Sequence, residues 1–511
     1  MAFEKVRVRF APSPTGGLHL GGVRTVLYNY LFAKQQKGEF ILRIEDTDKS
    51  RYVEGAEKYI FDCIDWCGLQ ADESVLRPGP YAPYRQSERK ETYKKYAEQL
   101  IKDGHAYYAF DTTEEIEALR EKLKASGSNS LMYDHHVRMQ MKNSLSLSTT
   151  ETQALLDQKT PYVIRVKVEP GQEMHFNDII RGEISFDTTH VDDKVLLKAD
   201  GMPTYHLAVV VDDFLMKISH AFRGEEWLPS APVHILLWKH LFGLENMPQW
   251  AHLPLILKPD GHGKLSKRDG DRLGFPVYAM DWKDPLTGNV TKGFKELGFL
   301  PQAFINMLAM LGWSSGTEQE IFTKEELVEK FSLERVHKAG AKFDFEKAKW
   351  YNHEWIKKLS PEELKADVIE IFSAKNIEIK DEDFLLKVIG LVKDRCTLLT
   401  DFYEQGIFFF QSPNVLDKEA VMPKWNDDKK QFFTLFAEEL ANLRDFDPLD
   451  IETSFKTLVA EKGIKPGELL LPLRIMLVGG KYGPGVFEIA SAIGSQETIR
   501  RINKALNIFN A

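Results

Sequence analysis

Residues 7–24 read Arg-Val-Arg-Phe-Ala-Pro-Ser-Pro-Thr-Gly-Gly-Leu-His-Leu-Gly-Gly-Val-Arg, and this stretch decides the expected fold. Apolar residues alternate with arginines up to Phe10, which predicts a short strand that the following prolines end. The glycines allow a sharp turn, and the apolar stretch 23–32 predicts a buried helix. A strand, a glycine-rich turn and a helix N-terminus form a phosphate site, because the first helical N–H groups lack partners and the helix dipole favours anions.

A second informative segment is the basic stretch 258–268, Lys-Pro-Asp-Gly-His-Gly-Lys-Leu-Ser-Lys-Arg. Its proline and glycines predict a loop, and its lysines and arginine make that loop strongly cationic. A charge run of this kind is usually a solvated surface. Lys264 and Lys267, however, stand three residues apart, so that one short loop can place both amines on a triphosphate.

The two segments together resemble paired signatures of one enzyme class. Ala-Pro-Ser-Pro-Thr-Gly at 11–16 with His19-Leu-Gly-Gly resembles the HIGH signature of class I aminoacyl-tRNA synthetases, and 264–268 resembles their KMSKS loop. The fourth position of the first motif is Gly22, which leaves His19 as its phosphate-facing histidine. Three stretches between the motifs complete a resemblance to the bacterial-type glutamyl-tRNA synthetases: Arg-Ile-Glu-Asp-Thr-Asp at 43–48, Tyr-His-Leu-Ala-Val-Val-Val-Asp-Asp at 205–213 and Arg-Gly-Glu-Glu-Trp at 223–227.

The resemblance implies a two-step ligation with ATP, Mg²⁺, L-glutamate and tRNA-Glu, carried out by a monomer. A carboxylate attacks the ATP α-phosphorus, and the tRNA ribose hydroxyl then takes the acyl group. The protein must hold anions together and stabilise charge on the phosphoryl group. The implied catalytic residues are His19, Lys264 and Lys267, and the implied ATP contacts are Gly16, His19, Gly21, Gly22, Lys264, Ser266 and Lys267.

Glutamate brings two carboxylates and an ammonium, and arginine is the natural reader of a carboxylate because its fork binds both oxygens. Arg9 lies at the end of the first predicted strand, facing the crevice where such folds bind ligands. Glu45 ends the next apolar strand and would pair with the α-ammonium. The residues that the resemblance implies for glutamate are Arg9, Ser13, Glu45, Tyr205 and Arg223.

The pattern along the chain predicts an α/β protein: a Rossmann-type catalytic domain split by an α+β insertion and followed by an all-helical anticodon-binding region. Helix-start signatures stand at Thr112, Thr323 and Ser360. The expected divisions are the first catalytic half at 1–102, the acceptor-end insertion at 103–195, the second catalytic half at 196–253, the KMSKS-like loop and stem-contact region at 254–330, and helical modules at 331–378 and 379–511.

Length and composition argue against several other classes of protein. The chain has 511 residues, too many for one core, with 43% hydrophobic and 28% charged residues. No apolar run approaches the ~20 residues that a membrane helix needs, and three cysteines form no disulfide framework, so we expect a cytoplasmic protein. The net charge of −9 does not indicate nucleic-acid binding, so an RNA partner would have to bind local basic patches.

Three further expectations concern zinc and the competing functions. Many relatives hold zinc in the insertion through Cys-x-Cys, but the equivalent stretch 106–111 has no cysteine, so we expect no zinc site. A glutaminyl-tRNA synthetase is a first alternative, which the helical C-terminal region disfavours. A non-catalytic tRNA-binding paralogue is a second, which the intact set of Arg9, His19, Glu45, Lys264 and Lys267 disfavours.

Overall fold

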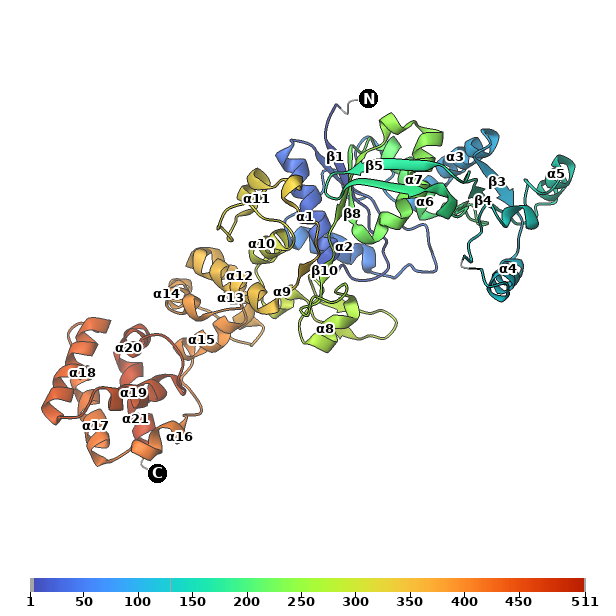
Figure 1. Cartoon of the computed structure of the whole chain (residues 1–511). Helices are drawn as coiled ribbons and strands as arrows, with labels where there is room; N and C mark the ends of the chain where they lie inside the picture. The colour runs from blue at the N-terminus through green and yellow to red at the C-terminus, as the bar shows by residue number, and fades with distance from the viewer. Residues whose placement is uncertain (1–3, 129, 510–511) are drawn as a thin grey trace. The chain divides into compact units, whose positions relative to one another are not determined.

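The computed structural model describes residues 4–128 and 130–509 (Figure 1). The chain divides into two compact units. The first comprises Met1–Glu296 and Phe304–Phe345, and the second comprises Leu297–Ala303 and Glu346–Ala511.

The first unit is built on a six-stranded sheet with the order β2-β1-β8-β9-β5-β6. Neighbouring strands are parallel except for the antiparallel pair β5 and β6. The order β2-β1-β8-β9 is that of a doubly wound sheet, which confirms the expected Rossmann-type fold. The strands are β1 (Arg7–Phe10), β2 (Glu39–Leu42), β5 (Glu173–Asp178), β6 (Gly182–Asp187), β8 (His220–Gly224) and β9 (Gln249–Leu253).

Helices connect and cover the parallel strands. Helix α1 (Leu20–Gln35) joins β1 to β2, and α7 (Ala231–Leu241) joins β8 to β9. Both helices carry apolar residues that are almost fully buried, as expected for crossover helices on a parallel sheet. The other helices of this unit are α2 (Ala56–Trp66), α3 (Lys90–Lys102), α6 (Tyr205–Leu215), α8 (Lys267–Leu273), α9 (Phe294–Leu297), α10 (Pro301–Met310) and α11 (Lys324–Lys330).

The segment expected as an insertion contributes to two sheets. A separate antiparallel sheet has the order β3-β4-β7, and α4 (Thr113–Ala125) and α5 (Thr149–Asp157) follow its first strand (Figure 1). The hairpin β5–β6, in contrast, extends the central sheet beside β9. The remaining strands are β3 (Ala106–Ala109), β4 (Val163–Val166), β7 (Val195–Leu197), β10 (Ile256–Leu257), β11 (Trp282–Lys283), β12 (Val290–Thr291) and β13 (Ala341–Lys342).

All three helix-start signatures are confirmed as capping boxes. Thr112, Thr323 and Ser360 each accept a hydrogen bond from the backbone of a glutamate three residues on, whose side chain accepts from the cap backbone in return. Each box satisfies N–H groups that a helix start otherwise leaves unpaired.

The second unit is helical throughout its described residues, as expected. Aromatic side chains form much of its core: Phe455 lies with its ring centroid 5.4 Å from that of Phe432 and 5.3 Å from that of Phe436. Its helices are α12 (Phe345–Lys358), α13 (Pro361–Ser373), α14 (Glu382–Val392), α15 (Asp401–Phe410), α16 (Lys418–Val421), α17 (Asp427–Asn442), α18 (Pro448–Lys462), α19 (Gly467–Val478), α20 (Val486–Ile493) and α21 (Ser495–Phe509).

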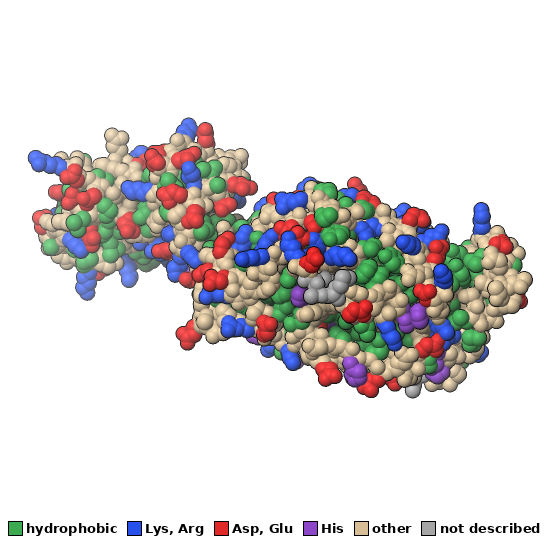
Figure 2. Space-filling view, turned by 90° about the horizontal axis from the view of Figure 1, so that it is seen from above, with side chains coloured by type: hydrophobic (Ala, Val, Ile, Leu, Met, Phe, Trp, Pro, Cys, Tyr) green, Lys and Arg blue, Asp and Glu red, His purple; other side chains and the backbone are tan. Residues whose placement is uncertain are grey.

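The surface carries both signs of charge. Figure 2 shows Lys and Arg side chains interspersed with Asp and Glu on the face in view. Among the helices of residues 4–128 and 130–509, none is long and apolar enough to cross a membrane.

Candidate functional site

A cavity of about 630 Å³ lies in the first unit beside the carboxyl ends of β1 and β8. This is the edge at which doubly wound sheets bind ligands. Gly16 is not among the residues that line the cavity, and the side chain of Lys267 lies outside the described residues. The cavity brings together the other expected site residues, Arg9, Ser13, His19, Gly21, Gly22, Glu45, Tyr205, Arg223, Lys264 and Ser266.

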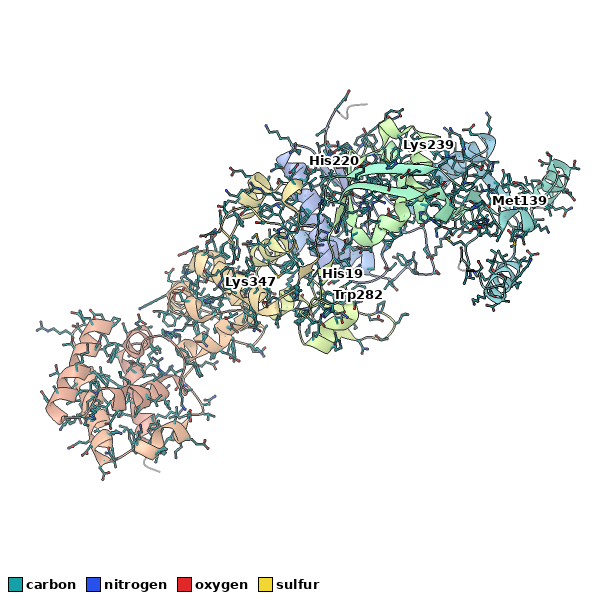
Figure 3. All side chains as sticks on the ribbon, in the orientation of Figure 1. His19, Met139, His220, Lys239, Trp282 and Lys347 are labelled. Atoms are coloured by element: carbon teal, nitrogen blue, oxygen red, sulfur yellow. The ribbon has the colours of Figure 1, made fainter. Side chains whose placement is uncertain are left out.

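His19 caps the N-terminus of α1, where Figure 3 labels it. Its Nδ1 accepts a hydrogen bond from the Gly21 N–H at 3.0 Å. A neutral ring that accepts at Nδ1 carries its hydrogen on Nε2, and Nε2 is therefore the donor side of the ring. A Cβ at Gly21 would lie 2.9 Å from His19 Cε1, so this close capping contact requires glycine. His19 thus has a structural task in addition to any catalytic one.

The basic loop is held between β10 and α8. The Lys264 ammonium lies 2.5 Å from Glu226 Oε1, and both side chains are partly exposed. Ser266 precedes α8, and its hydroxyl donates to Asp269 Oδ2 at 2.6 Å. Lys267 is the first residue of that helix. The loop therefore places Lys264 at the cavity wall on an ion pair that an anionic ligand can exchange.

Arg9 projects from β1 into a buried ionic cluster. Its Nε and Nη2 donate to the Asp213 carboxylate at 3.0 Å, and Nη1 donates to the Phe222 carbonyl at 3.2 Å. Arg43 Nη1 donates to the same carboxylate at 2.9 Å. Burial alone would raise the pKa of Asp213, but the charges of Arg9 and Arg43 hold it below its ordinary value. Arg9 Nη1 and Nη2 each carry a second hydrogen, which leaves capacity for a ligand carboxylate.

Glu45 follows β2 and lines the cavity with a side chain that is 9% exposed. Its Oε1 lies 3.3 Å from Arg43 Nη2. Burial raises the pKa of the Glu45 carboxyl to about 7, and the charges of Arg43 and Arg9 oppose that rise without cancelling it. A nearby cation would restore the charged form, which makes Glu45 a suitable partner for an ammonium group.

Arg223, at the end of β8, has donors available to a ligand. Its guanidinium carbon lies 4.3 Å from the centroid of the Trp250 ring, and Nη1 lies 2.9 Å from His234 Nδ1. Nε and Nη2 are buried and have no hydrogen-bond partner in the described part of the chain. Two such donors on one edge of a guanidinium match the two oxygens of a carboxylate.

Aromatic and hydroxyl groups complete the wall. Tyr205 begins α6, and its ring centroid lies 4.7 Å from that of Trp227, which is 43% exposed. Burial raises the pKa of the Tyr205 phenol, so it remains a neutral hydrogen-bonding group. Ser13 lies in the turn after β1, where its carbonyl accepts from the Thr15 N–H at 2.8 Å.

No group of three or more His, Cys, Asp or Glu residues that could hold a metal ion occurs within residues 4–128 and 130–509. Cys63, Cys67 and Cys396 are buried free thiols.

Comparison with known proteins agrees with this architecture. The family described as tRNA synthetases class I (E and Q), catalytic domain, matches residues 5–350, and the anticodon binding domain matches residues 346–506. The chain therefore belongs to the class I tRNA synthetases of the E and Q group. This membership confirms the resemblance found in the sequence.

The relatives within that group are named glutamate–tRNA ligases. The protein of Amoebophilus asiaticus (strain 5a2) is 50% identical over 505 residues, with 99% of this chain and 98% of the relative covered. The protein of Christiangramia forsetii is 50% identical over 504 residues, with 99% of each chain covered. The crystal structure of a glutamate tRNA ligase from Elizabethkingia meningosepticum in complex with its amino acid has a TM-score of 0.94 at 49% identity, covering 99% of this chain and all of that one.

Four residues that shape the cavity were not predicted from the sequence. Asp213 accepts hydrogen bonds from both Arg9 and Arg43. His234 contacts Arg223, and Glu226 forms an ion pair with Lys264. One signal was available, because Asp212 and Asp213 interrupt an apolar helix and acids seldom occur in such a setting without a partner. His234 gave no comparable signal, since a single histidine within an apolar helix is ordinary.

Proposed function

We propose that this chain is a glutamate–tRNA ligase, which joins L-glutamate to tRNA-Glu through a glutamyl-adenylate at the expense of ATP. The observation that carries the proposal is the cavity itself. It unites Arg223, a carboxylate reader with two donors that no described residue accepts from, with His19 at a helix N-terminus and Lys264 on a basic loop. The full-length relatives named glutamate–tRNA ligase support the same activity.

The glutamate roles follow from charge. Arg223 and Arg9 would each bind a carboxylate, and Glu45 would pair with the α-ammonium. Tyr205 and Ser13, which both line the cavity, would supply hydrogen bonds. The buried ionic cluster holds Arg9 in place before substrate arrives, so little reorganisation accompanies binding.

The nucleotide roles fall to the turn and the loop. His19 Nε2, the turn at Gly16 and the N-terminus of α1 with Gly21 and Gly22 would contact ATP phosphates. Lys264, Ser266 and Lys267 would close on the triphosphate, with Lys264 leaving Glu226. A glutamate carboxylate oxygen attacks the α-phosphorus and pyrophosphate leaves, while these donors stabilise the added charge. Mg²⁺ enters as part of the Mg²⁺–ATP substrate.

The tRNA would use both units. Residues 103–195 would contact the acceptor end, and the helical modules that we place at 331–378 and 379–511 would read the anticodon. In the second unit, Arg474 donates to the carbonyls of Tyr482 and Gly483, and Tyr482 is 44% exposed and available for base stacking. We place the protein in the cytoplasm as a monomer. The three free cysteines are as expected in a reducing compartment.

Aminoacylation of tRNA-Glu tests the proposal. The purified chain should charge this tRNA with labelled glutamate when Mg²⁺–ATP is present, and should charge neither tRNA-Glu nor tRNA-Gln with glutamine. Charging with glutamine in preference to glutamate would instead support a glutaminyl enzyme of the same family. Binding of tRNA without charging by either amino acid would support a non-catalytic paralogue.

A further inference from the structure

One buried and one half-buried imidazole lie behind the carboxylate-reading arginine. His234 on α7 is 1% exposed, and its Nδ1 lies 2.9 Å from Arg223 Nη1. Its other ring nitrogen, Nε2, lies 3.1 Å from Nδ1 of His206 on α6. Neither histidine lines the cavity. The three side chains therefore form one hydrogen-bonded row that begins at the cavity wall and runs into the protein.

The direction of each hydrogen bond in this row is determined by Arg223. A guanidinium can only donate, so His234 Nδ1 must accept. The hydrogen of the neutral His234 ring is then on Nε2, which donates to His206 Nδ1. Burial lowers the pKa of His234 well below its ordinary value, with Arg223 and His206 adding to the effect, and burial lowers the pKa of His206 to about 4. Both rings are therefore neutral at physiological pH.

The row determines which edge of the guanidinium is left for a ligand. His234 accepts from Nη1, and the centroid of the Trp250 ring lies 4.3 Å from the guanidinium carbon. Nε and Nη2 have no hydrogen-bond partner among the residues that the structure describes. Arg9 shows the same Nε–Nη2 edge bound to a carboxylate, that of Asp213. Without an acceptor for Nη1, the Arg223 side chain could rotate until Nη1 donates a hydrogen bond to another group. The Nε–Nη2 edge would then no longer be held in the orientation that binds a carboxylate.

We propose that His234 is a positioning residue for substrate recognition, whose Nδ1 orients Arg223 so that its Nε–Nη2 edge binds a carboxylate of the amino-acid substrate, and that His206 holds His234 in the required tautomer. This inference rests on the proposed function. It adds two residues outside the cavity to the determinants of substrate affinity. It also separates them from the nucleotide site, because neither histidine is among the residues that line the cavity, whereas His19 and Lys264 are.

Steady-state pyrophosphate exchange on the full chain, with Mg²⁺–ATP and tRNA-Glu present throughout because we expect activation to require the bound tRNA, tests the proposal with two substitutions at one position. His234→Leu removes the acceptor and should raise the KM for glutamate at least tenfold, with the KM for ATP and kcat changed less than threefold. His234→Asn can keep an oxygen near the place of Nδ1 and should restore most of the glutamate KM. If His234 only stabilised the fold, its loss would not raise the KM for glutamate while leaving the KM for ATP nearly unchanged. Asparagine would also not restore the glutamate KM better than leucine.

The matched control is His240→Leu, which removes a histidine from the same helix. His240 stacks on His105 at a ring-centroid separation of 3.6 Å, and its neighbour Lys239 is labelled in Figure 3. This variant should leave the glutamate KM unchanged. An unchanged glutamate KM in a folded His234→Leu enzyme would overturn the proposal, as would equal losses in the Leu and Asn variants.

His206→Phe decides the matter if His234→Leu does not fold. A raised glutamate KM at unchanged ATP KM would support the proposal, and an unchanged glutamate KM would overturn it. Failure of the proposed function is separate from both results, since it would appear as absence of glutamate-dependent exchange in the unsubstituted protein.

Discussion

Arg9 and Asp213 lie 204 positions apart in the sequence and form a two-point ion pair in which both side chains are 5% exposed. Asp213 also accepts from Arg43, which in addition lies 3.3 Å from Glu45 and 3.7 Å from Asp212, so the Asp213 carboxylate is shared by two buried guanidinium groups. Removing one member of such a cluster leaves uncompensated buried charge, which costs more than the intact pair contributes.

Asp213→Asn should therefore destabilise the first unit by ~3–5 kcal/mol. The urea midpoint, followed by tryptophan fluorescence, measures the change. Asp62→Asn is the matched control, because Asp62 forms an exposed pair with Lys58 within one helix and should change stability by no more than ~0.5 kcal/mol. Equal shifts for the two variants would show that the buried cluster contributes no more than a surface pair.

Glutamate binding should weaken at acid pH because of Glu45. Its pKa is raised to about 7 by burial, so the carboxyl is neutral below that pH and charged above it. The glutamate KM should fall as pH rises through 7, and at pH 6 it should be about tenfold above its plateau. Glu45→Gln should raise the KM and flatten this profile. A wild-type profile that is already flat between pH 6 and 8 would contradict the role of Glu45.

His19 has two separable tasks. His19→Ser keeps a good N-cap residue, so the free energy of unfolding should change by less than ~1 kcal/mol. It removes the Nε2 donor, so adenylate formation should slow by ~10²–10³-fold. Thermal melting and ATP–pyrophosphate exchange with tRNA-Glu present measure the two effects. Loss of stability with full exchange activity would leave His19 with the capping role alone.

The basic loop should act on the chemical step. Lys264→Ala and Lys267→Ala should each lower the kcat of exchange by ~10²-fold and leave the glutamate KM nearly unchanged, because the amines contact phosphates mainly in the transition state. Glu226→Gln is the control: it removes a partly exposed ion pair and should change exchange less than about fivefold. If transfer to tRNA falls as far as activation, the loop contacts tRNA instead.

The fold was largely predictable from local sequence. Residues 7–24 predicted β1, the turn and α1 because each of these elements depends on neighbours along the chain. The joining of β5 and β6 to the central sheet was not predicted, since strand pairing over long separations leaves no local signal. For the same reason Arg9 was expected at the cavity, but its pairing with Asp213 was not. The contact of His234 with Arg223 could not be predicted, because it depends on the distance between the two side chains in the fold and not on residue type.

The affinity of the chain for two adenylate analogues shows whether the cavity recognises a side-chain carboxylate. Glutamyl- and glutaminyl-sulfamoyl adenosine cannot be hydrolysed and differ only at the end of the side chain. Loss of a buried charge-assisted pair costs ~2–5 kcal/mol, so the glutamyl analogue should bind roughly 30-fold to several-thousand-fold more tightly, as measured by calorimetry. Substitution to alanine of whichever arginine binds the side-chain carboxylate, Arg9 or Arg223, should remove most of the difference. Equal affinity of the unsubstituted protein for both analogues would contradict recognition of a carboxylate in this cavity.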